Sequence, residues 1–500
     1  ARGGGVLGVP LTLPAPKPEF PFADGFDKDN ATPEQVQAFL DWKQAAAGWY
    51  TTERTRAGQN AGLTSRLREL REFQKYDRLY FPTFVDWRGR LYFRSSINPQ
   101  NSDFVKACLE LTDGKPLGDR GLFWLKVHVA NCAGYDKHSA ELKAKWTDDN
   151  LAMLTDFMEN PLDVAPPDVD TACTLYQAMR ALTQALSLPD PTTYVCHVPV
   201  AMDATCSGLQ HFSAMLRDPI GAMYTNLVDN QQDQKSDIYK YVGELADSIK
   251  PHMTDDPVIA DYWKDKPITR AMAKRPVMTY VYGSTMQSTM EYLCLDMRVA
   301  DMPVINDEEG NCLYSHNKLS VTIAKALRAA VKQTVPSAEA GMKFLHSLVR
   351  ASDYPIKWVT PVGMPVVNWG EELIQKRINI RSMGRHAAMC SMYTGEYSRA
   401  KAVSGIAPNF IHSLDSAHLC MVIAAADFSI IPIHDSFAAL PCDVDKMHEV
   451  LRSTFVELYS RDHLNELAST VVIRQGEDTV LPPKGDFDLQ NVLSARYMFC

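Results

Sequence analysis

The sequence predicts an α+β fold that is predominantly helical and contains a small antiparallel sheet. Helical patterns cover much of the chain, including residues 31–50, 119–134 and 269–283. Two short apolar runs, residues 198–203 and 429–441, are instead typical of buried strands, and the second predicts a hairpin. The 500 residues exceed one ordinary domain, so we expect two or three lobes around a substantial core.

Composition narrows the class of protein. Hydrophobic residues make up 46% of the chain and charged residues 22%, as in globular proteins. The 11 cysteines are scattered, which favours reduced thiols in a cytosol-like compartment over disulfides or a zinc site. There is no run of about 18 apolar residues, so no membrane span is expected. The net charge of −9 argues against a dedicated nucleic-acid coat but is compatible with an enzyme that concentrates positive charge in one cleft.

The N-terminal part predicts an arm followed by a helix. Residues 1–30 are rich in Gly, Pro and Phe, and the absence of an initiator Met indicates a processed or truncated chain. Thr32 is placed to cap a helix whose first residue is Pro33. Residues 51–71 carry five Arg and two Glu, a pattern that suits either a phosphate backbone or a solvated helix face.

Aromatic and charged residues alternate in residues 81–94 around Gly89, which predicts a strand–turn–strand. Arginines interleaved with aromatics, here Arg88 and Arg90, are the composition of a ledge that binds a single strand or a hybrid. An amphipathic hairpin without a ligand explains the pattern equally well. Lys106 follows on a short apolar helix.

Arg270, Lys274, Met278 and Tyr282 recur every fourth residue, so on a helix they share one face. Two cations, a thioether and a phenol then span roughly 18 Å, about the length of an extended nucleoside triphosphate. Taken alone, a solvated face with core residues explains this spacing better. Pro276 lies within the stretch and predicts a kink.

Asp203 and Asp435 each end an apolar strand. Either one alone is usually a turn former or a helix cap. Together with a phosphate-binding helix they predict nucleotidyl transfer, because two Mg²⁺ ions need shared carboxylates to serve an attacking hydroxyl and a leaving pyrophosphate. Lys274 is then placed to stabilise the triphosphate and to protonate the leaving group.

A second metal-site hypothesis uses His412, Asp415 and His418, which lie close together in the sequence. It is the weaker one, because the remaining ligands would have to come from elsewhere. A histidine on a helix near a nucleotide sugar is the better interpretation of His412.

The sequence resembles the single-subunit DNA-directed RNA polymerases of bacteriophages and mitochondria, and is most similar to the phage branch. The resemblance rests on six blocks, which follow the family's order along the chain: residues 86–92, 131–137, 203–218, 269–284, 405–412 and 434–437. It implies a right-hand polymerase fold with palm and fingers, in which the small sheet belongs to the palm. The implied activity is transcription of phage genes in the cytoplasm of a bacterial host.

The resemblance also implies a division of the chain. The N-terminal arm and partial thumb would occupy residues 1–75 and the first part of the palm residues 76–230. The fingers would occupy residues 231–411, with the nucleotide-binding helix and a basic promoter-reading hairpin at 376–401. Residues 412–500 would form the second part of the palm and the tail. The family's large N-terminal promoter-binding domain and half of its thumb would precede Ala1, or come from a separate polypeptide.

Residue roles follow from the same resemblance together with the residue patterns described above. Two Mg²⁺ ions would be held by Asp203, Asp435 and the backbone carbonyl of Ala204, where the family has Gly. Triphosphate contacts would come from Arg270, Lys274 and Lys137. The ribose side would be formed by Tyr282, His412, Tyr239, Met278 and Gly208. Contacts to nucleic acid would come from Arg88, Arg90, Lys106, Arg381, Arg385 and Arg399.

Two rival functions remain. Related repair DNA polymerases share the Arg-xxx-Lys…Tyr-Gly helix and the His-Asp hairpin, but place a Glu five residues after the first aspartate, where it occludes a ribose 2′-hydroxyl. Gly208 occupies that place here, which favours ribonucleotides. A catalytically inactive nucleic-acid-binding fragment is the other rival. The expected partners are double-stranded DNA template and promoter, nascent RNA and ribonucleoside triphosphates.

Overall fold

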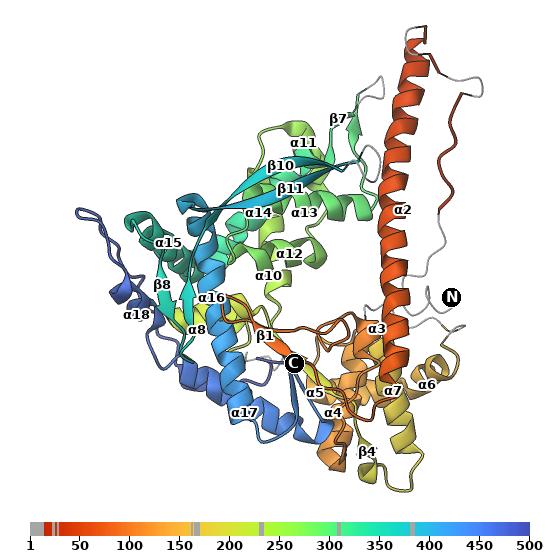
Figure 1. Ribbon diagram of the computed structural model, residues 1–500, viewed down its shortest axis with the longest axis vertical. Coiled ribbons are helices and arrows are strands. Elements are labelled where there is room, and N and C mark those ends of the chain that lie inside the picture. Colours follow the sequence, from red (N-terminus) through yellow and green to blue (C-terminus); the bar gives the residue numbers. More distant parts are fainter. Residues whose placement is uncertain are drawn as a thin grey trace. The chain divides into compact units, whose positions relative to one another are not determined.

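The computed structural model describes residues 15–22, 26–27, 30–161, 164, 171–229, 235–307, 312–380 and 386–500 (Figure 1). Helices dominate and the sheets are small, which confirms the predicted α+β, predominantly helical class. The chain divides into two compact units. Unit 1 comprises Ala1–Thr83, Phe93–Val200 and Leu440–Val444; unit 2 comprises Phe84–Tyr92, Ala201–Ala439 and Asp445–Cys500.

Unit 1 is mainly helical. Its helices are α2 (Pro33–Phe73), α3 (Asp103–Lys106), α4 (Gly118–Cys132), α5 (Ala140–Asp149), α6 (Leu151–Glu159) and α7 (Ala172–Leu186), and β3 (Lys115–Pro116) pairs with β4 (Val195–Cys196). The start of α2 is as predicted: Thr32 accepts from the N–H of Gln35, and the Gln35 side chain accepts from the N–H of Thr32. The N-terminal arm packs against this helix, where the ring centroids of Phe20 and Trp42 lie 4.7 Å apart.

The core of unit 1 is formed mainly by α4, α6 and α7. Leu125, Val129, Leu154, Phe157 and Leu175 are completely or almost completely buried there. The predicted helix over residues 119–134 is confirmed, and Gly134 follows it with a φ of +83°. That left-handed conformation costs glycine little, so the chain turns away directly after the helix.

The sheet that carries both aspartates lies in unit 2. Its strands, in the order β12-β13-β5, are β12 (Ile430–Ile433), β13 (Ser436–Ala439) and β5 (Val200–Asp203), and β12 and β13 are antiparallel. The predicted strand and hairpin are therefore confirmed. The buried helix α8 (Ser207–Leu216) follows β5 and contacts both α15 (Pro336–Ala351) and α16 (Arg399–Ala425).

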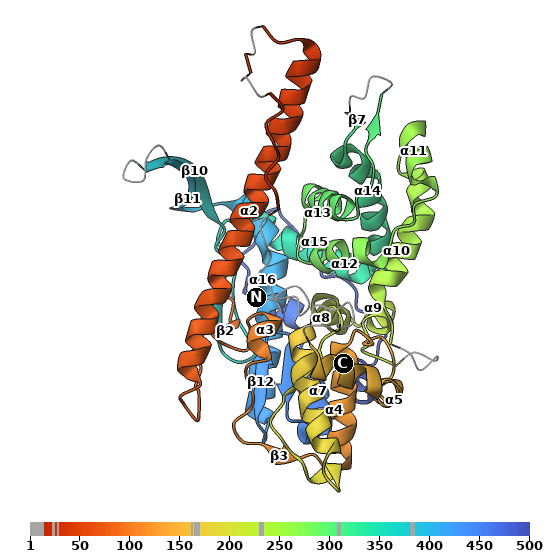
Figure 2. The same ribbon diagram turned by 90° about the vertical axis from the view of Figure 1, so that its right-hand side faces the viewer.

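The remaining elements of unit 2 are mostly helices, several of which Figure 2 shows in green around α12. They are α9 (Pro219–Tyr224), α10 (Ile238–Ile249), α11 (Pro257–Lys264), α12 (Arg270–Tyr280), α13 (Met286–Val299), α14 (His316–Thr334), α17 (Val444–Leu458) and α18 (His463–Thr470). Short hairpins join β6 (Ile305–Asn306) to β7 (Cys312–Tyr314) and β8 (Lys357–Val359) to β9 (Pro365–Val367). Within the described residues, no helix is both long and apolar enough to cross a membrane.

The helix predicted over residues 269–283 is shorter in the structure. Thr269 caps α12, which continues through Pro276 and ends at Tyr280, so Tyr282 lies in the following turn and not on the helix face. The Thr279 carbonyl accepts from the N–H groups of Tyr282 (3.2 Å) and Ser284 (3.1 Å), which closes this turn. Gly283 has a φ of +77° and completes it.

A hairpin is present where the basic one was expected at residues 376–401, and its strands lie slightly earlier in the chain. β10 (Glu371–Ile380) and β11 (His386–Tyr397) form a long antiparallel hairpin, which projects away from α12, α13 and α14 in Figure 2. Gly395 lies inside β11 with a φ of +80°, and its N–H donates to the Glu371 carboxylate (2.8 Å) at an irregular point of the ladder. Arg399 is the first residue of α16, so the end of the basic stretch is helical.

Another hairpin, of β1 (Thr83–Val85) and β2 (Leu91–Phe93), confirms the predicted strand–turn–strand. Gly89 adopts a φ of +95° in its turn. A Cβ on Gly89 would lie 3.3 Å from the sulfur of Met364 and 3.5 Å from the hydroxyl of Ser416, so the turn fits closely against α16. Arg88 and Arg90 thereby come next to the residues around His412.

Candidate active site

The backbones of the two predicted metal-binding segments are joined directly. The N–H of Ala204 donates to the carbonyl of Asp435 (3.0 Å), so the end of β5 lies beside the turn between β12 and β13. The C-terminal residues cover the other side: Cys500 N–H donates to the Asp203 carbonyl (3.1 Å), and Thr205 N–H to the Met498 carbonyl (3.4 Å). The bridge between Ala204 and Phe499 is thus made by flanking groups and does not use the Ala204 carbonyl.

The two carboxylates differ in environment. Asp203 is exposed, whereas Asp435 is half-buried. Burial, and then the negative charge of Asp415, raise the pKa of Asp435; Asp203 adds to the rise, and a hydrogen bond with Ser207 opposes it. Negative charge therefore accumulates around Asp435, and the neighbouring residues neutralise only part of it.

Both acidic turns contain a residue in the left-handed conformation. His434 precedes Asp435 with a φ of +55°, and Cys206 has the same φ before α8 begins. Non-glycine residues rarely adopt this conformation, which typically occurs where surrounding structure fixes a functional turn. His434 itself is half-buried.

Gly208 and Tyr282 are in direct contact. A Cβ on Gly208 would lie 2.7 Å from the Tyr282 hydroxyl oxygen, 2.9 Å from Cζ of the same ring and 2.9 Å from Val281. No side chain fits there unless the ring moves. Gly208 therefore leaves room for the phenol of Tyr282, in addition to any room that it leaves for a substrate.

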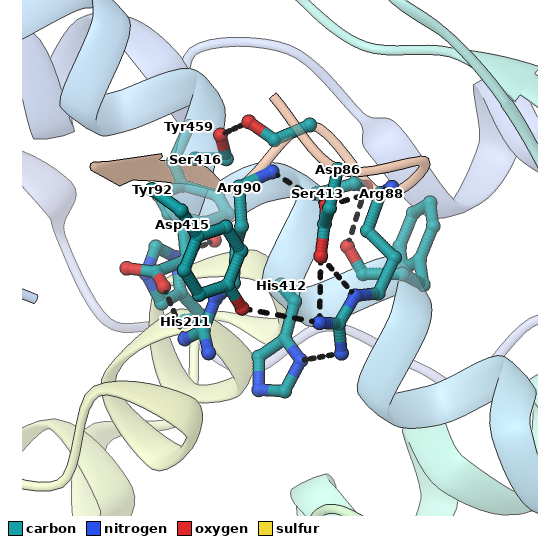
Figure 3. Close-up of polar contacts among 12 residues, drawn as sticks. Asp86, Arg88, Arg90, Tyr92, His211, His412, Ser413, Asp415, Ser416 and Tyr459 are labelled. Atoms are coloured by element: carbon teal, nitrogen blue, oxygen red, sulfur yellow. Dashed lines mark hydrogen bonds and ion pairs between the residues drawn. The ribbon is translucent and has the colours of Figure 1, made fainter. Parts of the chain in front are cut away.

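His412 faces Tyr282 from α16, with the ring centroids 4.7 Å apart. Burial, and then the positive charge of Arg90, lower the pKa of His412 to about 3, with a further contribution from Arg88. The ring is therefore neutral near pH 7. An Arg88 guanidinium nitrogen lies 3.3 Å from Nδ1 of His412 (Figure 3). Because a guanidinium only donates, Nδ1 accepts and the ring proton is on Nε2.

Asp415 is the centre of a buried network that sequence reasoning did not find. Its carboxylate accepts from Arg90 (2.8 Å) and lies 3.6 Å from Nε2 of His211, while Nδ1 of His211 lies 2.5 Å from the Tyr459 hydroxyl (Figure 3). Burial alone would raise the pKa of Asp415, but His211 and Arg90 hold it below its usual range. The network places a fixed negative charge behind Asp435 and a fixed cation near His412.

The structure connects the N-terminal end of α12 to the site through aromatic contacts. Arg270 donates to Asp237 (2.5 Å) and lies 5.4 Å from the ring centroid of Tyr239. The Tyr239 side chain is hydrogen-bonded to Cys206, and burial raises the pKa of Tyr239. Arg270 and Tyr239 are thus linked to the segment that joins Asp203 to α8.

The other candidate residues are more scattered. Lys274 and Met278 are exposed on α12. Arg88 and Arg90 form internal ion pairs with Asp86 and Asp415, and do not form an exposed ledge. Lys106 and Lys137 are exposed and belong to unit 1. Arg399 forms an ion pair with Asp353 at 3.0 Å. Arg381 and Arg385 fall outside the described residues.

The alternative metal site around His412 and His418 does not form. Nε2 of His418 faces the Leu451 carbonyl (3.0 Å) and the Thr454 hydroxyl (3.1 Å), while Asp415 faces Arg90 and His211. In the part of the chain that the structure describes, no group of three or more His, Cys, Asp or Glu residues is placed to hold a metal.

Comparison with known proteins places these residues in a family context. A family model for DNA-dependent RNA polymerase matches residues 115–481. The chain is 36% identical to a DNA-directed RNA polymerase of Pseudomonas phage phiKMV, in an alignment that covers 100% of this chain and 62% of that protein. It is 30% identical to T7 RNA polymerase of Escherichia phage T7, covering 93% of this chain and 58% of that protein. A mitochondrial DNA-directed RNA polymerase 1 of Arabidopsis thaliana is also 30% identical, over 100% of this chain and 51% of that protein. The chain thus spans less than two thirds of the length of each of these relatives.

Proposed function

Because the chain belongs to the DNA-dependent RNA polymerase family, we propose that it performs DNA-templated RNA synthesis. It would add ribonucleoside triphosphates to an RNA 3′ end and release pyrophosphate. The observation that carries this proposal is the joining of Asp203 and Asp435 through the Ala204 hydrogen bond, beside a Tyr282–His412 pair that faces Gly208. Carboxylates for metal and a polar pair for a sugar then lie in one site.

The proposed architecture is a right hand. The sheet of β5, β12 and β13 with α8 and α16 would form the palm, and α10 to α15 would form the fingers. Residues 76–230 and 412–500 would contribute the two parts of the palm, residues 231–411 the fingers, and residues 1–75 the arm and part of the thumb. This assignment is supported by the carboxylates on the sheet and the cations on α12.

The donor set fits divalent metal. Burial and neighbouring carboxylates raise the pKa of Asp435, so a dication would relieve repulsion there, and all three candidate ligands are oxygens. Asp203, Asp435 and the Ala204 carbonyl would hold two Mg²⁺ ions, which when bound supply positive charge to the 3′-hydroxyl and the leaving pyrophosphate.

The chain's own cations would bind the triphosphate. Arg270 begins α12, and Lys274 follows one turn later on the same helix. Arg270 is already oriented by Asp237 and Tyr239, so less side-chain entropy is lost when a phosphate binds. Lys274 is exposed, and would protonate the leaving pyrophosphate. Lys137 of unit 1 is a further proposed contact.

The ribose would bind between Tyr282 and His412. The Nε2–H of the neutral His412 is a donor for the 2′-hydroxyl oxygen, and the Tyr282 hydroxyl offers a second polar contact. Gly208 offers no side chain that would exclude that hydroxyl. Tyr239 and Met278 would complete the surroundings of the nucleotide.

The macromolecular partners would be the DNA template, its promoter and the nascent RNA. The β10–β11 hairpin would read the promoter through Arg381, Arg385 and Arg399, and Lys106 would contact backbone phosphate. Arg88 and Arg90 would act mainly from inside the site, since both are ion-paired there. The similarity to phage relatives supports a phage origin and action in the cytoplasm of a bacterial host.

Primer extension tests the proposal. The chain is mixed with an RNA primer on a DNA template in Mg²⁺, and incorporation of NTPs and of dNTPs is measured separately. We expect faster NTP incorporation, lost in Asp203→Asn and Asp435→Asn. Asp427→Asn is the matched control, because Asp427 is exposed in the loop before β12. Faster incorporation of dNTPs would favour a DNA polymerase, and no incorporation by the wild type a nucleic-acid-binding fragment.

A further inference from the structure

A small basic cavity lies directly behind the turn that carries Tyr282. Its volume is about 180 Å³, and its lining includes Tyr280, Ser284, Arg328, Lys332, Glu339, Lys343 and His346. Arg328 and Lys332 come from α14, and Glu339, Lys343 and His346 from α15. Both helices and the turn belong to unit 2.

The cavity carries more positive than negative charge. Three cations, Arg328, Lys332 and Lys343, face a single carboxylate, Glu339. The two lysines lie 3.6 and 3.4 Å from this carboxylate, beyond good hydrogen-bond distance, and they remain largely exposed. The Tyr280 hydroxyl already donates to Glu339 (2.6 Å), so that carboxylate is shared among three partners.

Two buried polar atoms at this cavity have no hydrogen-bond partner. They are the hydroxyl oxygen of Ser284 and Nε2 of His346. Arg328 is held beside them by a hydrogen bond to the Ser284 carbonyl (2.7 Å) and by the Tyr280 ring, 4.9 Å away. Buried polar atoms are usually paired, so two unpaired ones beside excess positive charge indicate an anionic ligand with several acceptor oxygens.

The size and position of the cavity narrow that ligand to a phosphate group on a polymer. About 180 Å³ is less than the roughly 300–1,000 Å³ of pockets that enclose a whole small molecule. In the proposed function the triphosphate lies at the Arg270 end of α12 and the RNA 3′ end at the two aspartates. In that arrangement the strand that is copied would bring its base to the nucleotide at Tyr282, so its backbone would pass near the turn at residues 281–284.

We propose that this cavity binds a phosphodiester group of the DNA template strand. Lys332 and Lys343 would contact the phosphate at the rim, and Arg328 and Ser284 from inside. The inference rests on the proposed polymerase function and adds a template contact to it. Because the same turn carries Tyr282, the contact would tie the position of the template to the sugar-sensing residue.

The test is a binding measurement with the full chain, so that it does not depend on catalysis. The variant Lys332→Gln/Lys343→Gln is compared with Lys318→Gln/Lys325→Gln, which removes two exposed lysines of α14 that do not line the cavity. Fluorescence anisotropy gives the Kd for an RNA primer on a DNA template with a single-stranded overhang, at several salt concentrations. We expect the slope of log Kd against log salt to fall by about 1 in the first variant and to stay unchanged in the control.

Methylphosphonates placed one at a time in the template then locate the contact. One neutral linkage near the templating base should weaken binding to wild type and have no further effect on the cavity variant. Equal slopes for the cavity and control variants would overturn the proposal, as would additive effects at every linkage. The proposal would also be overturned if the cavity variant lost as much affinity for a duplex that lacks the overhang. Inorganic phosphate that binds at the cavity and leaves template binding unchanged would overturn it too, because the cavity would then be a site for free anions. If wild type extends primers in any of these cases, only this inference fails; if wild type neither binds nor extends, the proposed function fails.

Discussion

Tyr282 is the residue on which sugar selection should depend, because its hydroxyl lies against Gly208 and its ring faces His412. Tyr282→Phe keeps the ring and removes only the oxygen. We expect extension with NTPs to persist while discrimination against dNTPs falls about tenfold or more, since one polar contact to the 2′-hydroxyl is worth roughly 1–2 kcal/mol. The ratio of kcat/KM for matched NTP and dNTP measures this. If the ratio does not change, Tyr282 contributes packing and not recognition.

Gly208→Ala tests the same contact from the other side. The new methyl carbon would lie 2.7 Å from the Tyr282 oxygen and 2.9 Å from Cζ, so the ring must move. We expect the extension rate to fall roughly 10- to 100-fold, the order of loss that a misplaced catalytic group causes. Tyr282→Phe removes the closest atom, so the double variant should recover part of this loss. Strictly additive losses would show that the methyl group acts on the substrate and not on the tyrosine.

Asp435 should make the folded protein less stable when no metal is bound. Its pKa is raised above the usual value, so the ionised carboxylate costs stability at every pH above the raised pKa, and this cost fades as the pH falls through it. Asp435→Asn should therefore raise Tm at pH 7 in EDTA, by about 2 °C. In Mg²⁺ the wild type should gain stability by ligand binding and the variant should not. Asp427→Asn is the control, and a lower Tm for Asp435→Asn in EDTA would contradict the assigned electrostatics.

At the scale of elements, local sequence was enough to predict the strands that end at Asp203 and Asp435, because a short apolar run bounded by turn residues is a local pattern. The same holds for the Thr32 cap and the Gly89 turn. It was not enough for the Asp415 network, because the hydrogen bond from Arg90 to Asp415 joins residues 325 positions apart. The end of α12 was also missed, because a four-residue spacing continues through Tyr282 although the backbone turns after Tyr280.

Helix α12 contains Pro276 and yet runs continuously from Arg270 to Tyr280. Proline cannot donate to the Met272 carbonyl, and its ring presses on that turn. Pro276→Ala should restore the hydrogen bond and raise Tm by a few degrees, since proline inside a helix costs up to about 3 kcal/mol. The KM for NTPs should change more than kcat if the proline sets the spacing between Arg270 and Tyr282. A lower Tm would show that packing of the buried proline ring outweighs the lost hydrogen bond.

At the scale of the whole molecule, we expect the proposed elongation activity to be separable from initiation. The residues proposed for nucleotide addition, Asp203, Tyr282, His412 and Asp435, all lie in unit 2 and within the family match at 115–481, whereas the chain spans only 62% and 58% of its phage relatives. We therefore expect this 500-residue polypeptide to extend a primed template but to start poorly on duplex promoter DNA.

Transcription from three templates measures this separation: an RNA-primed single strand, a promoter with a pre-melted bubble, and the intact promoter duplex. Activity should be highest on the primed strand, at least tenfold lower on the duplex, and partly restored by the bubble, because melting then no longer depends on protein contacts. Salt gives a second expectation: raising it should weaken duplex binding before primed extension, since attraction between exposed cations and phosphates is screened while enclosed contacts persist. Equal activity on all three templates would show that residues of this chain separate the promoter strands by themselves.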